Sequence, residues 1–120
     1  MKIVITSQGE DLSSAVDPRF GRAATFILYD LETDEWKAVD NAQNLNALRG
    51  AGIQAAESAA KLEAGAVVTG HCGPNAFRTL NAAGIKLYVG CEGTVAEAVE
   101  AFKAGKLQEA DAADVEGHWM

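Results

Sequence analysis

The sequence is poor in cysteine. Its 120 residues include two, Cys72 and Cys91, which are too few for a disulfide framework and too far apart for the C-x-x-C motif of thiol redox enzymes. We therefore expect two free thiols. With 48% hydrophobic residues, a chain of this length can bury a core as one domain without disulfides or structural metal.

Positive charge and long apolar runs are also scarce. Ten basic side chains against seventeen acidic ones give a net charge of -7, which argues against binding to nucleic acid or anionic membranes. No apolar stretch approaches the roughly 20 residues of a membrane span, and the start of the chain lacks the features of a signal peptide. We expect a cytoplasmic protein, and a monomer because no amphipathic face is left over. The sequence neither identifies nor excludes a protein partner.

Common catalytic motifs are missing as well. The "GAG" at residues 50–52 does not follow a strand as a dinucleotide-binding motif should, and no Walker motif or G-x-S-x-G occurs. The adjacent His71 and Cys72 fall short of a closed zinc site. The sequence therefore favours a non-enzymatic protein.

The hydrophobic pattern predicts an α/β protein. A hairpin follows the first strand, and strand and helix then alternate, so the last two strands should run parallel beside the first. Thr94 and Glu97 have the spacing of a capping box at the start of the last helix. We expect strands at residues 2–7, 25–31, 35–41, 66–70 and 85–90, helices at 53–65, 74–84 and 94–105, and an acidic, loosely held tail at 108–120 after a single domain at 1–107.

Ligands of open α/β sheets bind beyond the carboxyl ends of the parallel strands. This rule brings three segments to one edge, residues 17–22 in a long polar loop, 70–73 and 90–93. Two helix N-termini should point to the same place, where free backbone N–H groups favour an anion. Arg19 and Arg22 can add full positive charges. We predict an anion site with soft ligands nearby.

The stretch "GHCGPNAF" at residues 70–77 allows several interpretations. Its glycines suit an ordinary strand-to-helix turn. Cys72 at a helix N-terminus should have a lowered thiol pKa, which suits metal ligation or reactivity, although a small buried cysteine fits too. His71 is better placed for ligation or for hydrogen bonding to an anion than for a Cys-His dyad. Cys91 is more typical of a structural residue.

Taken in order, several stretches resemble the dinitrogenase iron-molybdenum cofactor family. They are "MKIVITS", "DPRFGRA", "GAGIQAAESAAKLEAGAVVTGHCGPNAFRTLNAAGIKLYVG" and "GTVAEAVEAFKAGKL". The resemblance implies a ribonuclease H-like three-layer fold, whose five-stranded mixed sheet has the order 3-2-1-4-5 with helices on both faces. Ribonuclease chemistry would need clustered carboxylates on metal ions, and the first strand has none.

The resemblance also implies binding of a metal-sulfur cluster. The chain looks most like the orange protein type, whose members bind a molybdenum-copper sulfide cluster, whereas nitrogenase-assembly members carry the iron-molybdenum cofactor or its precursor. A small cysteine-dependent redox protein or enzyme is the alternative of a different class. We expect His71 and Cys72 to be the candidate metal ligands. The candidate cluster-binding residues are Arg19, Phe20, Gly21, Arg22, Gly70, His71, Cys72 and Gly73.

Overall fold

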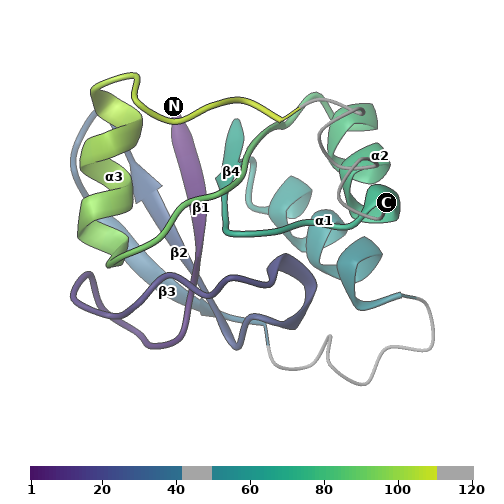
Figure 1. The fold of residues 1–120 in the computed structure, drawn as a ribbon, viewed down its shortest axis with the longest axis horizontal. Coiled ribbons are helices and arrows are strands. Elements are labelled where there is room, and N and C mark those ends of the chain that lie inside the picture. The colour runs from purple at the N-terminus through teal and green to yellow at the C-terminus, as the bar shows by residue number, and fades with distance from the viewer. Residues whose placement is uncertain (42–49, 111–120) are drawn as a thin grey trace.

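A five-stranded mixed sheet forms the centre of the protein. The computed structural model describes residues 1–41 and 50–110. The sheet has the order β3-β2-β1-β4-β5, which confirms the predicted order. Figure 1 shows the strands between α3 on one side and α1 and α2 on the other. The strands are β1 Lys2–Ser7, β2 Thr25–Asp30, β3 Trp36–Asp40, β4 Ala66–Val68 and β5 Lys86–Tyr88.

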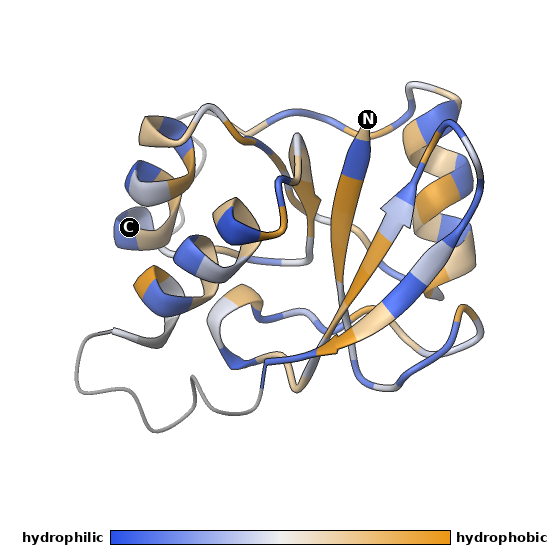
Figure 2. Cartoon of the chain, turned by 180° about the vertical axis from the view of Figure 1, so that it is seen from behind, coloured by the Kyte–Doolittle hydropathy of each residue, from blue (hydrophilic) through white to orange (hydrophobic). Residues whose placement is uncertain are grey.

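Strand β1 is central because its side chains are apolar on both faces. It pairs antiparallel with β2 and parallel with β4, and Ile3, Val4 and Ile5 are fully buried. A strand covered on both faces shows such a continuous apolar run. In Figure 2 this strand is coloured as hydrophobic along most of its length. The edge strand β3 is mostly exposed by contrast.

Helices cover both faces of the sheet, as predicted. Helices α1 (Ala51–Lys61) and α2 (Pro74–Ala82) share one core with Val4 and Phe26, whereas α3 (Val95–Lys103) packs on the opposite face. The fully buried alanines of α1, which are Ala55, Ala56 and Ala59, have short side chains that allow the helix to lie close to its neighbours.

The end of α1 differs from the prediction. Gly65 was expected to end this helix, but the helix ends at Lys61 and Glu63 takes the left-handed conformation with φ of 61°. Gly65 instead donates its N–H to the Lys2 carbonyl, and a Cβ there would lie 3.0 Å from Met1 Cε. The glycine therefore permits the chain to pass close to the N-terminus of β1.

The other helix boundaries follow the sequence signals. Pro74 occupies the first turn of α2, and Gly84 follows that helix with φ of 76°. Thr94 and Glu97 form the predicted capping box of α3. Ala110 is buried and donates its N–H to the Leu87 carbonyl over 2.7 Å, so chain packing extends to this residue at the edge of β5. The remainder of the acidic tail, residues 111–120, lies outside the described residues.

Candidate functional site

The loop that follows β1 returns to the sheet and is bonded to it through the main chain. Asp17 donates its N–H to the Thr6 carbonyl, and Val16 donates to the Gly93 carbonyl, both over 2.9 Å. A single turn of 3-10 helix, η1 Phe20–Arg22, follows, with Arg19 as its N-cap and Arg22 as its last residue. Phe20 is 1% exposed and stacks on Phe26 of β2, with ring centroids 5.7 Å apart. The loop that carries Arg19 and Arg22 is therefore held on both sides of Arg19, by main-chain bonds at Val16 and Asp17 and by the buried ring of Phe20.

A buried polar network lies beneath this loop. The Thr6 hydroxyl donates to the Asp17 carbonyl over 2.7 Å and lies 2.8 Å from the Thr69 hydroxyl. Both threonines are fully buried, and Asp17 is 5% exposed. The Asp17 carboxylate in turn accepts the Arg19 main-chain N–H over 2.9 Å. The network joins the ends of β1 and β4 to the loop.

The loop also contacts the turn after β4 directly. Phe20 donates its N–H to the His71 carbonyl over 3.0 Å. Gly70 lies so close to the loop that a Cβ there would be 2.7 Å from Pro18 Cα. A side chain at position 70 would push the loop away, so the first glycine of "GHCG" is needed for this close approach.

These segments surround a pocket of about 550 Å³. All of the predicted cluster-binding residues line it except Gly70, which packs against Pro18 of the loop. The pocket also includes the start of α1, which the sequence interpretation missed. The lining residues are Arg19, Phe20, Gly21, Arg22, Gly50, Gly52, Ile53, His71, Cys72, Gly73, Pro74, Asn75 and Ala76.

The N-termini of α1 and α2 meet at this pocket. Their N-cap residues, Gly50 and Gly73, make no side-chain capping bond. A Cβ on Gly52 would lie 3.0 Å from Ala76 Cβ, so the two helix ends pack closely. Within the described part of the chain, the N–H groups of Asn75 and Ala76 have no acceptor. Two positive helix ends side by side favour a bound anion.

The two loop arginines differ in their surroundings. Arg19 Nε lies 3.7 Å from Asp17 Oδ1, and the Arg19 side chain is 64% exposed. Arg22 is exposed, and its guanidinium forms no ion pair with any residue that the structure describes. No lysine and no acidic side chain lines the pocket within residues 1–41 and 50–110. A locally positive pocket thus exists in a protein with a net charge of -7.

Cys72 contradicts one prediction. It lines the pocket yet is 3% exposed, and its Sγ donates to the Gly73 carbonyl over 3.5 Å. Burial raises the pKa of the Cys72 thiol to about 12. The expected lowering by the helix N-terminus was wrong, because the cost of a buried thiolate exceeds the attraction of the helix end. His71, which also lines the pocket, is half-buried.

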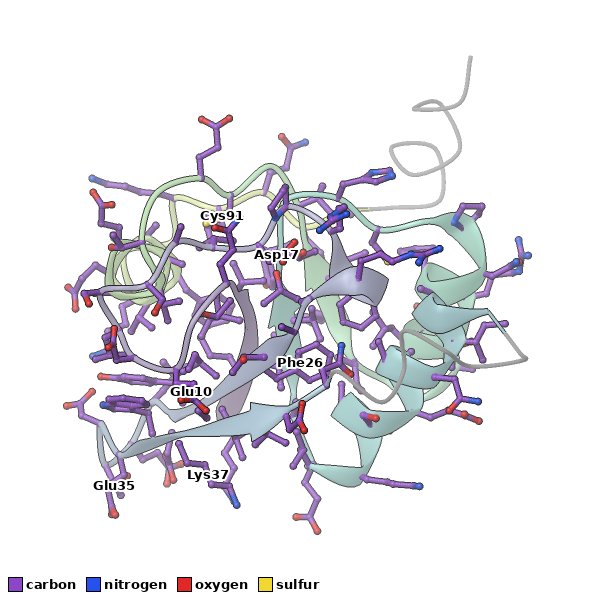
Figure 3. All side chains as sticks on the ribbon, turned by 90° about the horizontal axis from the view of Figure 1, so that it is seen from below. Glu10, Asp17, Phe26, Glu35, Lys37 and Cys91 are labelled. Atoms are coloured by element: carbon purple, nitrogen blue, oxygen red, sulfur yellow. The ribbon has the colours of Figure 1, made fainter. Side chains whose placement is uncertain are left out.

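The segment at residues 90–93 reaches the predicted sheet edge but does not line the pocket. Its backbone is close, since Gly90 donates its N–H to the Gly70 carbonyl over 2.9 Å. However, Cys91 packs in the core under α3, and Figure 3 shows it on the α3 side of the molecule, with α1 on the other. The N-terminus of α3 is closed by its own capping box. Of the two helix ends predicted at the site, only that of α2 lines it.

The start of α1 could have been placed from the sequence. A helix that connects into a parallel strand runs antiparallel to that strand, so α1 must begin at the edge where β4 ends. The "GAG" at residues 50–52 does not directly follow a described strand and so is not a dinucleotide-binding motif. Its second glycine instead allows the close contact between α1 and α2.

The described residues contain neither a cluster of metal ligands nor a membrane-spanning helix. No group of three or more His, Cys, Asp or Glu side chains there could hold a metal ion. Nor is any helix in the described ranges long and apolar enough to cross a membrane.

The fold and pocket define an α/β binding domain with a positive, partly apolar pocket at one sheet edge. The chain belongs to the dinitrogenase iron-molybdenum cofactor family, whose model, described as "Dinitrogenase iron-molybdenum cofactor", matches residues 1–105. The predicted family is thereby confirmed. A cofactor-binding role is supported for this family.

Solved structures include similar chains. The apo form of the orange protein from Desulfovibrio gigas is 44% identical with a TM-score of 0.88, covering 91% of this chain and 92% of that one. A Thermotoga protein provisionally described as NifB is 40% identical with a TM-score of 0.78, covering 90% and 91%. Among protein sequences, an uncharacterised Methanocaldococcus jannaschii protein is 28% identical over 111 residues, which are 91% of each chain. The predicted likeness to the orange protein is confirmed.

Replacing Thr69 by valine tests the network under the loop. Thr69→Val keeps the side-chain shape but removes the hydroxyl, so we expect the free energy of unfolding to fall by about 1–2 kcal/mol. Urea denaturation measures this, and faster hydrogen exchange at the Asp17 and Phe20 amides would place the effect in the loop. The matched Thr79→Val removes a hydroxyl from a less buried position and should change stability by less than about 0.5 kcal/mol. Equal effects would contradict the network's role.

The state of the Cys72 thiol can be measured in a Cys91→Ser protein. Because burial keeps Cys72 protonated, we expect the native protein to react with DTNB at least about ten-fold more slowly than the urea-unfolded chain at pH 8. A pKa raised in the folded state also means that stability falls as the pH rises from about 9 towards 12. Stopped-flow absorbance gives the rates. Equal native and unfolded rates would indicate the exposed thiolate that a redox enzyme needs.

Proposed function

We propose that this protein binds and carries an anionic metal-sulfur cluster of the molybdenum-copper sulfide kind, without catalysing a reaction. The observation that carries this proposal is the close packing of two uncapped helix N-termini, at Gly52 and Ala76, beside two loop arginines. Like poles of two helices repel each other, and an anion between them relieves that repulsion.

The chemistry of the pocket suits a sulfide-faced anion. Its backbone N–H groups and the guanidinium groups of Arg19 and Arg22 can donate to sulfides, while Ile53 and Pro74 supply apolar surface. A delocalised anion with sulfide faces is less strongly hydrated than an oxyanion, so it can use both kinds of contact. The cluster would then be held mainly as a whole anion.

Direct protein-metal bonds are a second possibility for the same pocket. His71 and Cys72 are its candidate ligands, and soft metals favour a thiolate. Cys72 would first have to lose a proton that burial holds firmly. For this reason we assign the main role to charge and backbone donors and place the binding function in residues 1–107.

The iron-molybdenum cofactor or its precursor is the alternative cargo. The family description and the Thermotoga relative provisionally described as NifB support it. Metal analysis distinguishes the two cargoes, because the molybdenum-copper sulfide cluster brings copper and the iron-molybdenum cofactor brings iron. The cysteine-dependent redox alternative finds little support, since both thiols are buried and their pKa values are raised by burial.

Reconstitution tests the proposal. The apo protein is mixed with tetrathiomolybdate and copper and passed through a gel-filtration column. We expect a visible charge-transfer band to elute with the protein, together with molybdenum and copper in a fixed ratio. The Cys72→Ser protein should keep this band if the cluster is held as an anion, and lose or shift it if Cys72 is a ligand. A wild-type protein that elutes colourless and free of these metals would refute the proposal.

Removing Arg22 should weaken retention of the cluster. We expect Arg22→Ala to cost about 1–3 kcal/mol of binding free energy, because a charge-assisted hydrogen bond is lost, and Arg19→Ala to cost less, because Asp17 shares that guanidinium. Titration with tetrathiomolybdate and copper, followed by absorbance at two salt concentrations, measures both. Lys61→Ala, at the far end of α1, is the charge-matched control. Wild-type affinity in both arginine variants would show that neither arginine contributes to binding.

A further inference from the structure

We propose that Arg78, which does not line the pocket, draws anions towards it and so sets the rate at which the cluster enters. This inference rests on the proposed function of the pocket and assigns a role to an additional residue. It concerns the approach of the ligand rather than its retention.

The position of the Arg78 side chain carries the proposal. Arg78 is exposed on α2, and its guanidinium donates to the side-chain carbonyl of Asn75. Asn75 belongs to the first turn of α2 and lines the pocket. The bond therefore turns the guanidinium back along the helix, towards the rim of the pocket.

This placement is electrostatically unfavourable unless an anion is near. A cation is stabilised at the C-terminal end of a helix and destabilised at the N-terminal end, where the helix is already positive. Here Asn75, in the first turn of α2, holds a cation beside one such end, which packs closely against the start of α1. The capture of anions accounts for an arrangement that helix stability alone disfavours.

The distribution of cations points the same way. The chain has four arginines and six lysines. The three arginines within the described ranges, which are Arg19, Arg22 and Arg78, all lie in or beside this pocket, whose lining there includes no lysine. Planar guanidinium groups suit a large, weakly hydrated anion better than the strongly hydrated ammonium of lysine.

A steering residue is needed because the protein as a whole repels its ligand. At a net charge of -7, the field at long range opposes an approaching anion, and only a local positive patch can guide it. Arg78 extends the positive surface beyond the pocket mouth, and its reach is limited to about 10 Å at 0.1 M salt. Its effect should therefore appear in the association rate and fade as salt rises.

The test compares Arg78→Gln with Lys86→Gln. Each lowers the net charge from -7 to -8, but Lys86 is exposed and pairs with Ala66 at the start of β4, away from the turn that lines the pocket. With tetrathiomolybdate as probe in stopped-flow absorbance, we expect Arg78→Gln to lower the association rate constant about three- to ten-fold at low salt. The dissociation rate constant should change less than two-fold, because a charge at the rim acts mainly on association, and Lys86→Gln should resemble the wild type.

Several results would overturn the role of Arg78. These are equal effects in the two variants, a change confined to dissociation, or a difference that persists at high salt. Asn75→Ala adds a check that keeps the charge but releases the guanidinium, and we expect an association rate between those of the wild type and Arg78→Gln. A rate equal to the wild type in Asn75→Ala would show that the hydrogen bond does not position the group.

A second probe separates this inference from the proposed function. If the wild-type protein takes up tetrathiomolybdate neither alone nor together with copper, the proposed cargo is wrong, and sodium sulfate then reports on the same positive rim. We expect sulfate to shift the Ala76 amide resonance in NMR spectra, with at least two-fold weaker apparent binding in Arg78→Gln than in Lys86→Gln at low salt. Equal sulfate binding in both variants would refute the role of Arg78 whatever the cargo.

Discussion

The hydrogen bond between the buried Thr6 hydroxyl and the Asp17 carbonyl is the constraint on which the rest of the site depends. Thr6 is the next-to-last residue of the central strand β1, Thr69 directly follows the neighbouring strand β4, and Asp17 begins the segment that carries Arg19 and Arg22. A buried hydroxyl without a partner costs about 1–3 kcal/mol, so the three groups stabilise one arrangement together. With the loop held in this position, the Phe20 ring enters the core and the His71 main-chain carbonyl accepts the Phe20 N–H.

This constraint lets an acidic protein present a positive pocket. Acidic side chains occupy much of the exposed surface, but within the described ranges none lines the pocket. Part of its positive character comes from fixed groups, namely two helix ends and a loop whose backbone is bonded on both sides. Donors that are already in position lose little conformational entropy when a ligand binds. Binding can therefore be selective without a large number of charges.

The behaviour of Cys72 follows from a competition between two effects. A helix N-terminus stabilises a nearby negative charge by about 0.3–2 kcal/mol. The rise in the thiol pKa from 9.0 to about 12 corresponds to a free energy of about 4 kcal/mol in the opposite direction. Desolvation is the larger effect, so the residue is a protonated, apolar part of the pocket wall. This agrees better with a carrier than with a thiol enzyme.

The order of the elements and the strand arrangement of the sheet could be predicted from the amino-acid sequence. Apolar periodicity located β1, the hairpin and the alternating strands, and the capping box of α3 was visible in Thr94 and Glu97. The rule that ligands bind at the carboxyl edge placed Arg19, Arg22 and His71 together, and all three line one pocket. These features depend on local patterns and on chain connectivity, which a sequence displays directly.

The face of the sheet on which each cysteine lies could not be predicted without the packed structure. Cys72 and Cys91 follow neighbouring strands within similar glycine-rich turns, yet they enter opposite cores. The packing of Gly52 against Ala76, which brings α1 to the pocket, and the burial that keeps the Cys72 thiol protonated depend on contacts between distant segments. Such contacts, and the local dielectric they create, arise only when helices and sheet are packed together, and no local pattern in the sequence encodes them.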